Sequence, residues 1–283
     1  MSFENHFPFA SLPGDLTLDQ CDVILSLVSI AENSSTKWWQ QYNYAENNHD
    51  GRGITISIVG FCTGTGDFIQ VLQDLQKINP NHKLVKYIPG VQKVDGTDSI
   101  IGIENLENDI HNLGDDKEWQ TAVWNMIIKL YWSPAMNVAK KYSCKYAITK
   151  GFLYDLALNH GSGEMEKMIK KIVGVSTPIN GGDEKLWLSK LIDVRQNIIV
   201  NVDTSTNNGQ PDRCIMWRSV LTNQNVNLTR PLNNLICYGD TFNIVATTPT
   251  TPTTPTTPIK LTFTLTNKST TNFVLKAGQS ITI

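Results

Sequence analysis

Residues 17–32 read TLDQCDVILSLVSIAE, and this stretch shows most clearly the helical pattern that prevails before residue 247. Thr17 and Gln20 match a capping box, in which Thr occupies the N-cap and Gln the third helical position. Glu32 lies on the same face of the predicted helix as the apolar residues. These apolar positions recur at steps of three and four: Leu18, Cys21, Leu25 and Val28.

Glu32 is unusual on an apolar stripe, because burying a carboxylate away from water is costly. Burial raises the pKa of a carboxyl group. The C-terminal end of a helix, where Glu32 is expected, also disfavours negative charge. Both effects predict a group that can donate a proton near neutral pH. On periodicity alone, the alternative that Glu32 is a solvated surface residue stays open.

Asp50 follows eighteen residues later, in the polar turn His49-Asp-Gly-Arg-Gly53. A flexible turn with an arginine nearby favours the ionised carboxylate. One neutral and one charged carboxyl group in contrasting environments are what glycoside hydrolysis requires. An ordinary Asp-Gly turn without a chemical role is equally compatible with this pattern.

The rest of the chain up to residue 246 is also mainly helical in pattern. Ile54, Ile56 and Ile58 alternate with Thr55 and Ser57, which predicts a short strand. The sequence therefore predicts a mainly α (α+β) body with a small β element near residues 53–61. One helix is expected to start near residues 65–67, and another to follow an N-cap at Asp183. Four more are expected at about 116–132, 135–142, 149–159 and 164–172.

A Thr-Thr-Pro repeat occupies residues 247–258 and marks the strongest boundary in the chain. Such a repeat favours an extended, polyproline-like linker. Apolar residues alternate with threonines after it, from Leu261 to Thr266, and further strand patterns appear at 273–275 and 280–283. The expected organisation is a catalytic body over 1–246, a linker over 247–258 and a short β-rich tail of unknown role over 259–283.

The charge is unevenly distributed along the chain. Its 283 residues include 24 basic and 26 acidic side chains, a formal charge of −2. Lys260, Lys268 and Lys276 follow the boundary and no acid does, so residues 1–246 hold 21 basic and 26 acidic residues, or −5. The near-balance argues against nucleic-acid binding, and no apolar run reaches the ~20 residues that span a bilayer.

The five cysteines are scattered along the sequence without a CxxC pair or a Cys/His cluster. That spacing argues against a structural zinc site and favours free thiols, with one disulfide left open. No basic segment followed by an apolar run is visible at the N-terminus, so a secretory signal is not apparent in this chain.

Several motifs resemble those of the family 46 glycoside hydrolases, over residues 15–245. They are Ala31-Glu-Asn-Ser-Ser35, Trp39-Gln-Gln-Tyr42, Tyr44-Ala-Glu46, Asp50-Gly-Arg-Gly53, Gly60-Phe-Cys-Thr-Gly-Thr-Gly-Asp67, Val94-Asp-Gly-Thr-Asp-Ser99, Tyr154-Asp155, His160-Gly161, Gly181-Gly-Asp-Glu184 and Leu191-Ile-Asp-Val-Arg195. The resemblance implies an endo-acting, inverting chitosanase with a lysozyme-like, two-lobed helical fold and no cofactor or metal. It also implies an extracellular location.

The resemblance assigns roles to matching residues. Glu32 is similar to the general acid, Asp50 to the general base, and Thr55 to a threonine that positions the attacking water. Matches to substrate-binding residues are Tyr44, Glu46, Arg52 and Asp67, the last binding an amino group. Matches to an ion network that supports the acid are Asp155, Arg195 and Arg213. For each residue beyond Glu32 and Asp50, a role in fold support alone stays open. Ile54 departs from the family pattern, which has an aromatic residue there.

The expected substrate agrees with the charge. Chitosan is a cationic glucosamine polymer, and carboxylates in the site would attract its ammonium groups. We expect chitosan as the partner, no nucleic-acid or membrane partner, and a monomer. Two alternatives remain open from the sequence: a lysozyme-like hydrolase of chitin or peptidoglycan, and a non-catalytic glucosamine-polymer binding protein.

Overall fold

The computed structural model describes residues 3–202, 210–246, 260–264 and 270–274. Residues 3–246 form one compact unit and residues 247–283 another. The predicted linker at 247–258 and the strand predicted at 280–283 lie outside the described residues. Among the described helices, none has both the length and the apolar composition that crossing a membrane requires.

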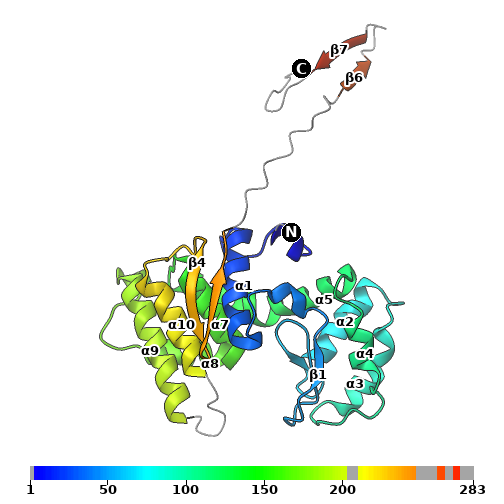
Figure 1. The fold of residues 1–283 in the computed structure, drawn as a ribbon, viewed down its shortest axis with the longest axis horizontal. Coiled ribbons are helices and arrows are strands. Elements are labelled where there is room, and N and C mark those ends of the chain that lie inside the picture. Colours follow the sequence, from blue (N-terminus) through cyan, green and yellow to red (C-terminus); the bar gives the residue numbers. More distant parts are fainter. Residues whose placement is uncertain (1–2, 203–209, 247–259, 265–269, 275–283) are drawn as a thin grey trace. The chain divides into compact units, whose positions relative to one another are not determined.

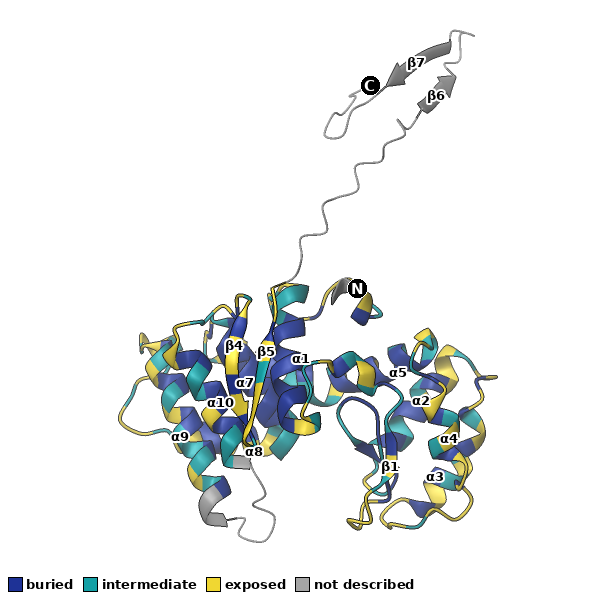
Figure 2. Ribbon diagram, viewed as in Figure 1, coloured by how far each residue is buried: buried dark blue, intermediate teal, exposed yellow. Residues whose placement is uncertain are grey.

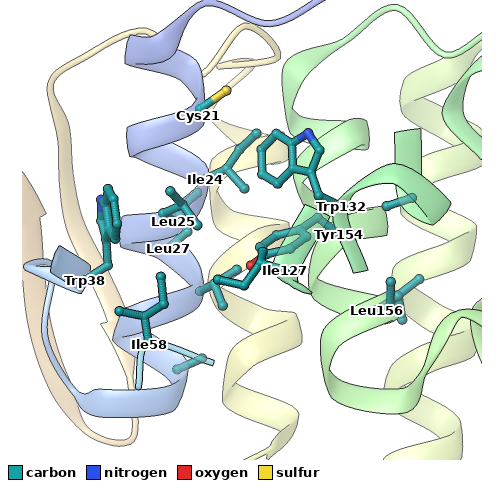
Figure 3. Packing of buried hydrophobic residues seen from close by; sticks show 14 of the residues in the cluster. Cys21, Ile24, Leu25, Leu27, Trp38, Ile58, Ile127, Trp132, Tyr154 and Leu156 are labelled. Carbon is teal, nitrogen blue, oxygen red and sulfur yellow. The ribbon is translucent and has the colours of Figure 1, made fainter. Parts of the chain in front are cut away.

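Helix α1 (Leu18–Asn33) begins with the capping box predicted from the sequence: Thr17 Oγ1 accepts from the Gln20 amide, and the Gln20 side chain accepts from the Thr17 amide. The helix is buried on all sides, not along one stripe, because every residue from Cys21 to Ala31 is buried. Figure 3 shows its side chains between Trp38 on one side and Trp132 with Tyr154 on the other.

The unit that contains α1 is mainly helical, as predicted (Figure 1). Helices α7, α9 and α10 belong to one group of neighbouring elements, and α2, α3 and α4 belong to another. Figure 2 shows that buried residues concentrate where these elements face one another, α1 and α7 above all. The helices after α1 are α2 (Phe68–Ile78), α3 (Ile88–Val94), α4 (Leu106–His111), α5 (Lys117–Ile127), α6 (Ser133–Lys141), α7 (Ala147–His160), α8 (Ser162–Lys170), α9 (Glu184–Val202) and α10 (Gln210–Thr222).

Most of the predicted helices are confirmed, with one difference in the middle of the chain. The helix predicted over 116–132 is α5 followed by a π-helical turn over Ile128–Trp132, which runs directly into α6. Pro134 therefore lies directly after the π-helical turn, inside a continuous helical segment, and does not end the helix as predicted. Asp183 caps α9 as predicted, because its Oδ1 accepts from the Leu186 amide at 2.8 Å.

The predicted β element is a three-stranded antiparallel sheet of β1 (Ala45–Asn47), β2 (Ile54–Ile56) and β3 (Phe61–Cys62). One row of paired residues is buried: Ala45, Ile56 and Phe61. The neighbouring row, Glu46, Thr55 and Cys62, lies on the other face of the sheet. Strand β2 ends sooner than the alternation suggests, because Ser57 has a φ of 66°.

Two further hairpins follow the helices. Strands β4 (Leu232–Cys237) and β5 (Asp240–Ile244) pair with each other, and β4 packs on α10. In the second unit, β6 (Lys260–Thr264) and β7 (Thr270–Val274) form an antiparallel hairpin from Lys260 opposite Val274 to Thr264 opposite Thr270. An isolated two-stranded hairpin is marginally stable in water.

Candidate active site

Glu32 lies in the last turn of α1, where the continuous burial of that helix stops at Ala31. Its side chain is 34% exposed, and its Oε1 pairs with the guanidinium of Arg213 on α10. The expectation of a carboxyl group buried among apolar residues is therefore wrong. The buried part of the helix ends at Ala31, one residue before Glu32, and the guanidinium of Arg213 contacts the carboxylate.

Arg213 connects Glu32 to a fully buried ion network. Its Nε lies 2.9 Å from Oδ1 of Asp155, and Nη1 of Arg195 lies 2.5 Å from the other oxygen of the same carboxylate. Asp155 and Arg195 are 0% exposed and Arg213 is 2% exposed. Positive and negative groups thus alternate from Arg195 through Asp155 and Arg213 to Glu32. We call these four residues the Glu32 network.

The charges of this network stabilise one another. Burial alone would raise the pKa of Asp155, but Arg195 and Arg213 outweigh it and hold that pKa below the usual value. Burial would lower the pKa of Arg213, but Asp155 and Glu32 keep it above its usual value. Each buried ion is therefore compensated, and removing a buried member would take a partner away from each buried charge that it contacts.

The sequence argument did not assign a role to three further partners of the network. Arg195 donates to His160 Nε2 at 3.2 Å and to Asn159 Oδ1 at 3.0 Å, and Trp217 donates to Asp155 Oδ2 at 2.9 Å. Burial, with the nearby Arg195 charge, lowers the pKa of His160 to about 4, which leaves a neutral ring that accepts this hydrogen bond. Asn159 lies one helical turn after Asp155, a spacing that could have identified it.

Asp50 lies in the loop between β1 and β2 and is held by Arg52. Nε and Nη2 of Arg52 donate to Asp50 Oδ2 at 3.0 and 2.6 Å, and the Arg52 amide donates to Oδ1 at 3.1 Å. These bonds hold the pKa of Asp50 below its usual value. The ionised state that the sequence predicts is thus supported. Gly53 ends the loop with a φ of 77°, where a Cβ would lie 2.2 Å from Thr63 Oγ1.

The sheet places two other predicted residues near this loop. Glu46 and Thr55 face each other across β1 and β2. Tyr44 donates its hydroxyl to Glu46 Oε2 at 2.9 Å, and Asn48 donates to Thr55 Oγ1 at 3.2 Å. Tyr44, Glu46, Asp50, Arg52 and Thr55 are therefore gathered on one small sheet and its first loop.

Asp67 is placed differently from the free carboxylate that a substrate-binding role suggests. It is the N-cap of α2, and its Oδ1 accepts from the Phe68 amide, the Cys62 amide and the Thr65 hydroxyl at 2.8, 3.0 and 2.7 Å. One oxygen is therefore committed to the fold. Within the part of the chain that the structure describes, Oδ2 accepts no hydrogen bond, so it is the atom able to meet an ammonium group.

Two consecutive residues lie between the Glu32 network and the sheet. Tyr131 stacks on Phe61 of β3 with ring centroids 6.4 Å apart, and Trp132 packs against Tyr154 at 4.9 Å. Burial, together with charges that include Glu32, raises the pKa of Tyr154. Burial, Asp67 and Cys62 raise the pKa of Tyr131. The turn that carries Tyr131 and Trp132 therefore packs on β3 through one ring and on α7 through the other.

A further cluster of possible metal ligands contains none of the residues described so far in this site. Its members are His82, Asp116 and Glu118. His82 Nδ1 accepts from the Leu84 amide at 3.2 Å, and Nε2 faces Asp116 Oδ2 at 3.4 Å. A neutral ring that accepts at Nδ1 carries its proton on Nε2, so no lone pair of His82 is available to a metal. The geometry is that of a structural contact between two loops.

Comparison with known proteins settles the family. Residues 26–232 match the model of glycosyl hydrolase family 46. The chain belongs to glycosyl hydrolase family 46. This matched range contains every site residue considered above, from Glu32 to Arg213.

Curated and solved members of family 46 agree. A chitosanase of Nocardioides sp. is 33% identical over 230 residues, which cover 79% of this chain and 81% of that protein. A chitosanase of Bacillus subtilis (strain 168) is 32% identical over 234 residues, covering 77% and 82%. The crystal structure of a mutant chitosanase from Bacillus subtilis MY002, complexed with 6 GlcN, superposes with a TM-score of 0.72 at 30% identity, covering 81% of this chain and 99% of that one.

This family 46 chain departs from the expected family sequence at Ile54, and the structure shows where that residue goes. Ile54 is 1% exposed and belongs to the core, so it makes no contact with solvent. All five cysteines lie within the described residues, and each is a buried free thiol. The disulfide that the sequence left open does not form.

Proposed function

We propose that this family 46 member hydrolyses β-1,4 linkages between glucosamine residues inside chitosan chains, by inversion, with Glu32 as general acid and Asp50 as general base. The main support is that the two carboxyl groups stand on separate elements, each with its own arginine partner. Glu32 ends a helix and rests on a buried ion network, whereas Asp50 is ionised on a loop and held by Arg52. The family relatives named chitosanase support the choice of polymer.

The reaction proceeds in one displacement. Glu32 gives a proton to the glycosidic oxygen, and the bond from that oxygen to the anomeric carbon breaks. Asp50 takes a proton from a water, whose oxygen bonds to the anomeric carbon from the opposite face. Inversion requires room for that water, with carboxyl groups about 6.5–9.5 Å apart. Thr55 holds the water beside Asp50.

The buried network supports Glu32 in both of its protonation states. Arg213 faces the carboxylate that remains after proton transfer and stabilises its charge, while Asp155 and Arg195 hold Arg213 in place. The side chain of Glu32 is 34% exposed, so it regains a proton from solvent after each turnover. Of the three supporting residues, Arg213 contacts Glu32 directly, and Asp155 and Arg195 act on the reaction through Arg213.

Substrate recognition follows from charge. A glucosamine polymer carries an ammonium group on each unit, and residues 1–246 have a formal charge of −5. Glu46 and the free Oδ2 of Asp67 offer local carboxylates, and Tyr44 and Arg52 line the same loop region. We propose a monomer that acts outside the cell, where a polymer too large to cross a membrane is found.

The deciding experiment is hydrolysis of fully deacetylated chitosan followed by NMR. We expect a falling chain length before small products accumulate, and a first product of inverted anomeric configuration. A retained first product would refute the mechanism. Greater activity on acetylated chitin or on peptidoglycan than on chitosan would refute the substrate. Light scattering during size-exclusion chromatography tests the monomer.

A further inference from the structure

The hydroxyl of Thr55 lies between two side chains that have no assigned role. Asn48 Nδ2 donates to Thr55 Oγ1 at 3.2 Å, and Cys62 Sγ lies 3.7 Å from the same oxygen. Asn48 comes from the loop that also carries Asp50, and Cys62 pairs with Thr55 across β2 and β3. Two separate segments therefore converge on one hydroxyl group.

The direction of the contact with Cys62 follows from a second hydrogen bond. The Cys62 thiol donates to the Gly60 carbonyl oxygen at 3.3 Å. A thiol has a single hydrogen, so the sulfur can only accept from Thr55. Burial raises the pKa of Cys62, which keeps that hydrogen on the sulfur at neutral pH. The hydroxyl of Thr55 is therefore the donor in this pair.

The rotamer of Thr55 is fixed from the opposite side. Gly60 has a φ of 70°, and a Cβ at this position would lie 3.2 Å from Thr55 Cγ2, which shows how closely its backbone approaches the methyl group. A β-branched side chain has few accessible χ1 angles. With the methyl group seated against Gly60, the hydroxyl is directed toward Asn48 and Cys62.

A threonine hydroxyl has one hydrogen and two lone pairs. At Thr55 the hydrogen goes to Cys62 and one lone pair takes the Asn48 N–H, so a single lone pair is left. That lone pair can accept an O–H from a water. A water that gives one hydrogen to Thr55 and the other to Asp50 turns an oxygen lone pair toward a third direction, which is the arrangement an attacking water needs.

We propose that Asn48 and Cys62 are positioning residues that fix the Thr55 hydroxyl as a hydrogen-bond acceptor toward the attacking water. The inference rests on the proposed function, because it needs Thr55 to hold that water and Asp50 to take its proton. Both act through Thr55.

A double-mutant cycle tests this dependence on Thr55. Asn48→Leu removes the hydrogen-bond donor and keeps a side chain of similar size. Cys62→Ala removes the acceptor, whereas Cys62→Ser replaces the thiol by a hydroxyl group that can also accept. We expect Asn48→Leu and Cys62→Ala each to lower kcat on chitosan by about five-fold, the size expected for one hydrogen bond, with KM unchanged. Cys62→Ser should recover part of the loss. In a Thr55→Val background, neither substitution should lower kcat further.

His49→Asn is the matched control, because His49 is an exposed neighbour in the same loop with a φ of 53°, which asparagine tolerates. Its kcat should equal that of the unmodified protein, and thermal unfolding of every variant separates loss of fold from loss of positioning. The inference would be overturned if the substitutions lowered kcat equally with and without Thr55. It would also be overturned if kcat were unchanged in both single variants, or if only KM rose. Activity that survives in Asp50→Asn would instead refute the proposed function, and this inference with it.

Discussion

Replacing Asp155 by asparagine tests whether the buried network holds this part of the protein together. Asp155 is 0% exposed, and its carboxylate meets Arg195 at 2.5 Å and Arg213 at 2.9 Å. Asparagine has nearly the same shape but no charge, so two buried guanidinium groups lose the anion between them. Removing one partner from a buried ion pair costs about 3–5 kcal/mol. For a domain of this size the midpoint of thermal unfolding should fall by about 6–20 °C.

The matched control is Asp193→Asn on α9. Asp193 also pairs with an arginine, Arg218, at 2.6 Å, but the two side chains are 41% and 32% exposed. An exposed pair contributes about 0–1 kcal/mol, which corresponds to a loss of at most about 4 °C. Circular dichroism during heating, at equal protein concentration and salt, compares the two variants. Equal losses in both, or a smaller loss in Asp155→Asn, would refute the reasoning.

Acid titration provides a second measurement on the same variant. The pKa of Asp155 in the folded protein is held below its usual value. Its stabilising contribution is therefore complete above the unfolded pKa, about 3.9, and is lost as the pH falls through the folded pKa. The difference in unfolding free energy between the unmodified protein and Asp155→Asn should be constant near neutral pH and shrink in acid. A difference that grows in acid would contradict the sign of the shift.

Three other predictions concern catalysis and the tail. Glu32→Gln and Asp50→Asn should each lower turnover of chitosan by about 10²–10⁴-fold while polymer binding persists, and azide should restore cleavage in Asp50→Asn only; full activity in either variant would sink its assigned role. Arg52→Gln removes the group that lowers the pKa of Asp50, so the acidic limb of the kcat/KM profile should move to higher pH, and an unmoved limb would separate Asp50 from that limb. Truncation after Ala246 should leave activity on soluble chitosan near normal and weaken binding to insoluble polymer, as measured by co-sedimentation; lost activity would make the tail part of the catalytic body.

Much of the local structure could be predicted because its causes lie close together in the sequence. The capping box of Thr17 and Gln20 spans three residues, and Asp183 caps α9 within three residues. The alternation around Thr55 identifies β2, although the strand ends earlier than predicted, at the positive φ of Ser57. The ionised state of Asp50 follows from Arg52, two residues away. Each of these features depends on contacts within one turn or one loop.

The sequence alone determined the family and the helical class, because these depend on short motifs and on periodicity, and it led to the proposal that Glu32 and Asp50 are the two catalytic carboxyl groups. Only the tertiary structure decided the environment of Glu32. Its partner, Arg213, lies 181 positions away in the chain. The family resemblance implied that Arg213 supports the acid, but the helical periodicity around Glu32 predicted an apolar environment, because periodicity reports only nearby residues. The same holds for the Thr55 hydroxyl, whose hydrogen-bonding direction depends on a loop and a neighbouring strand that meet only in the folded sheet.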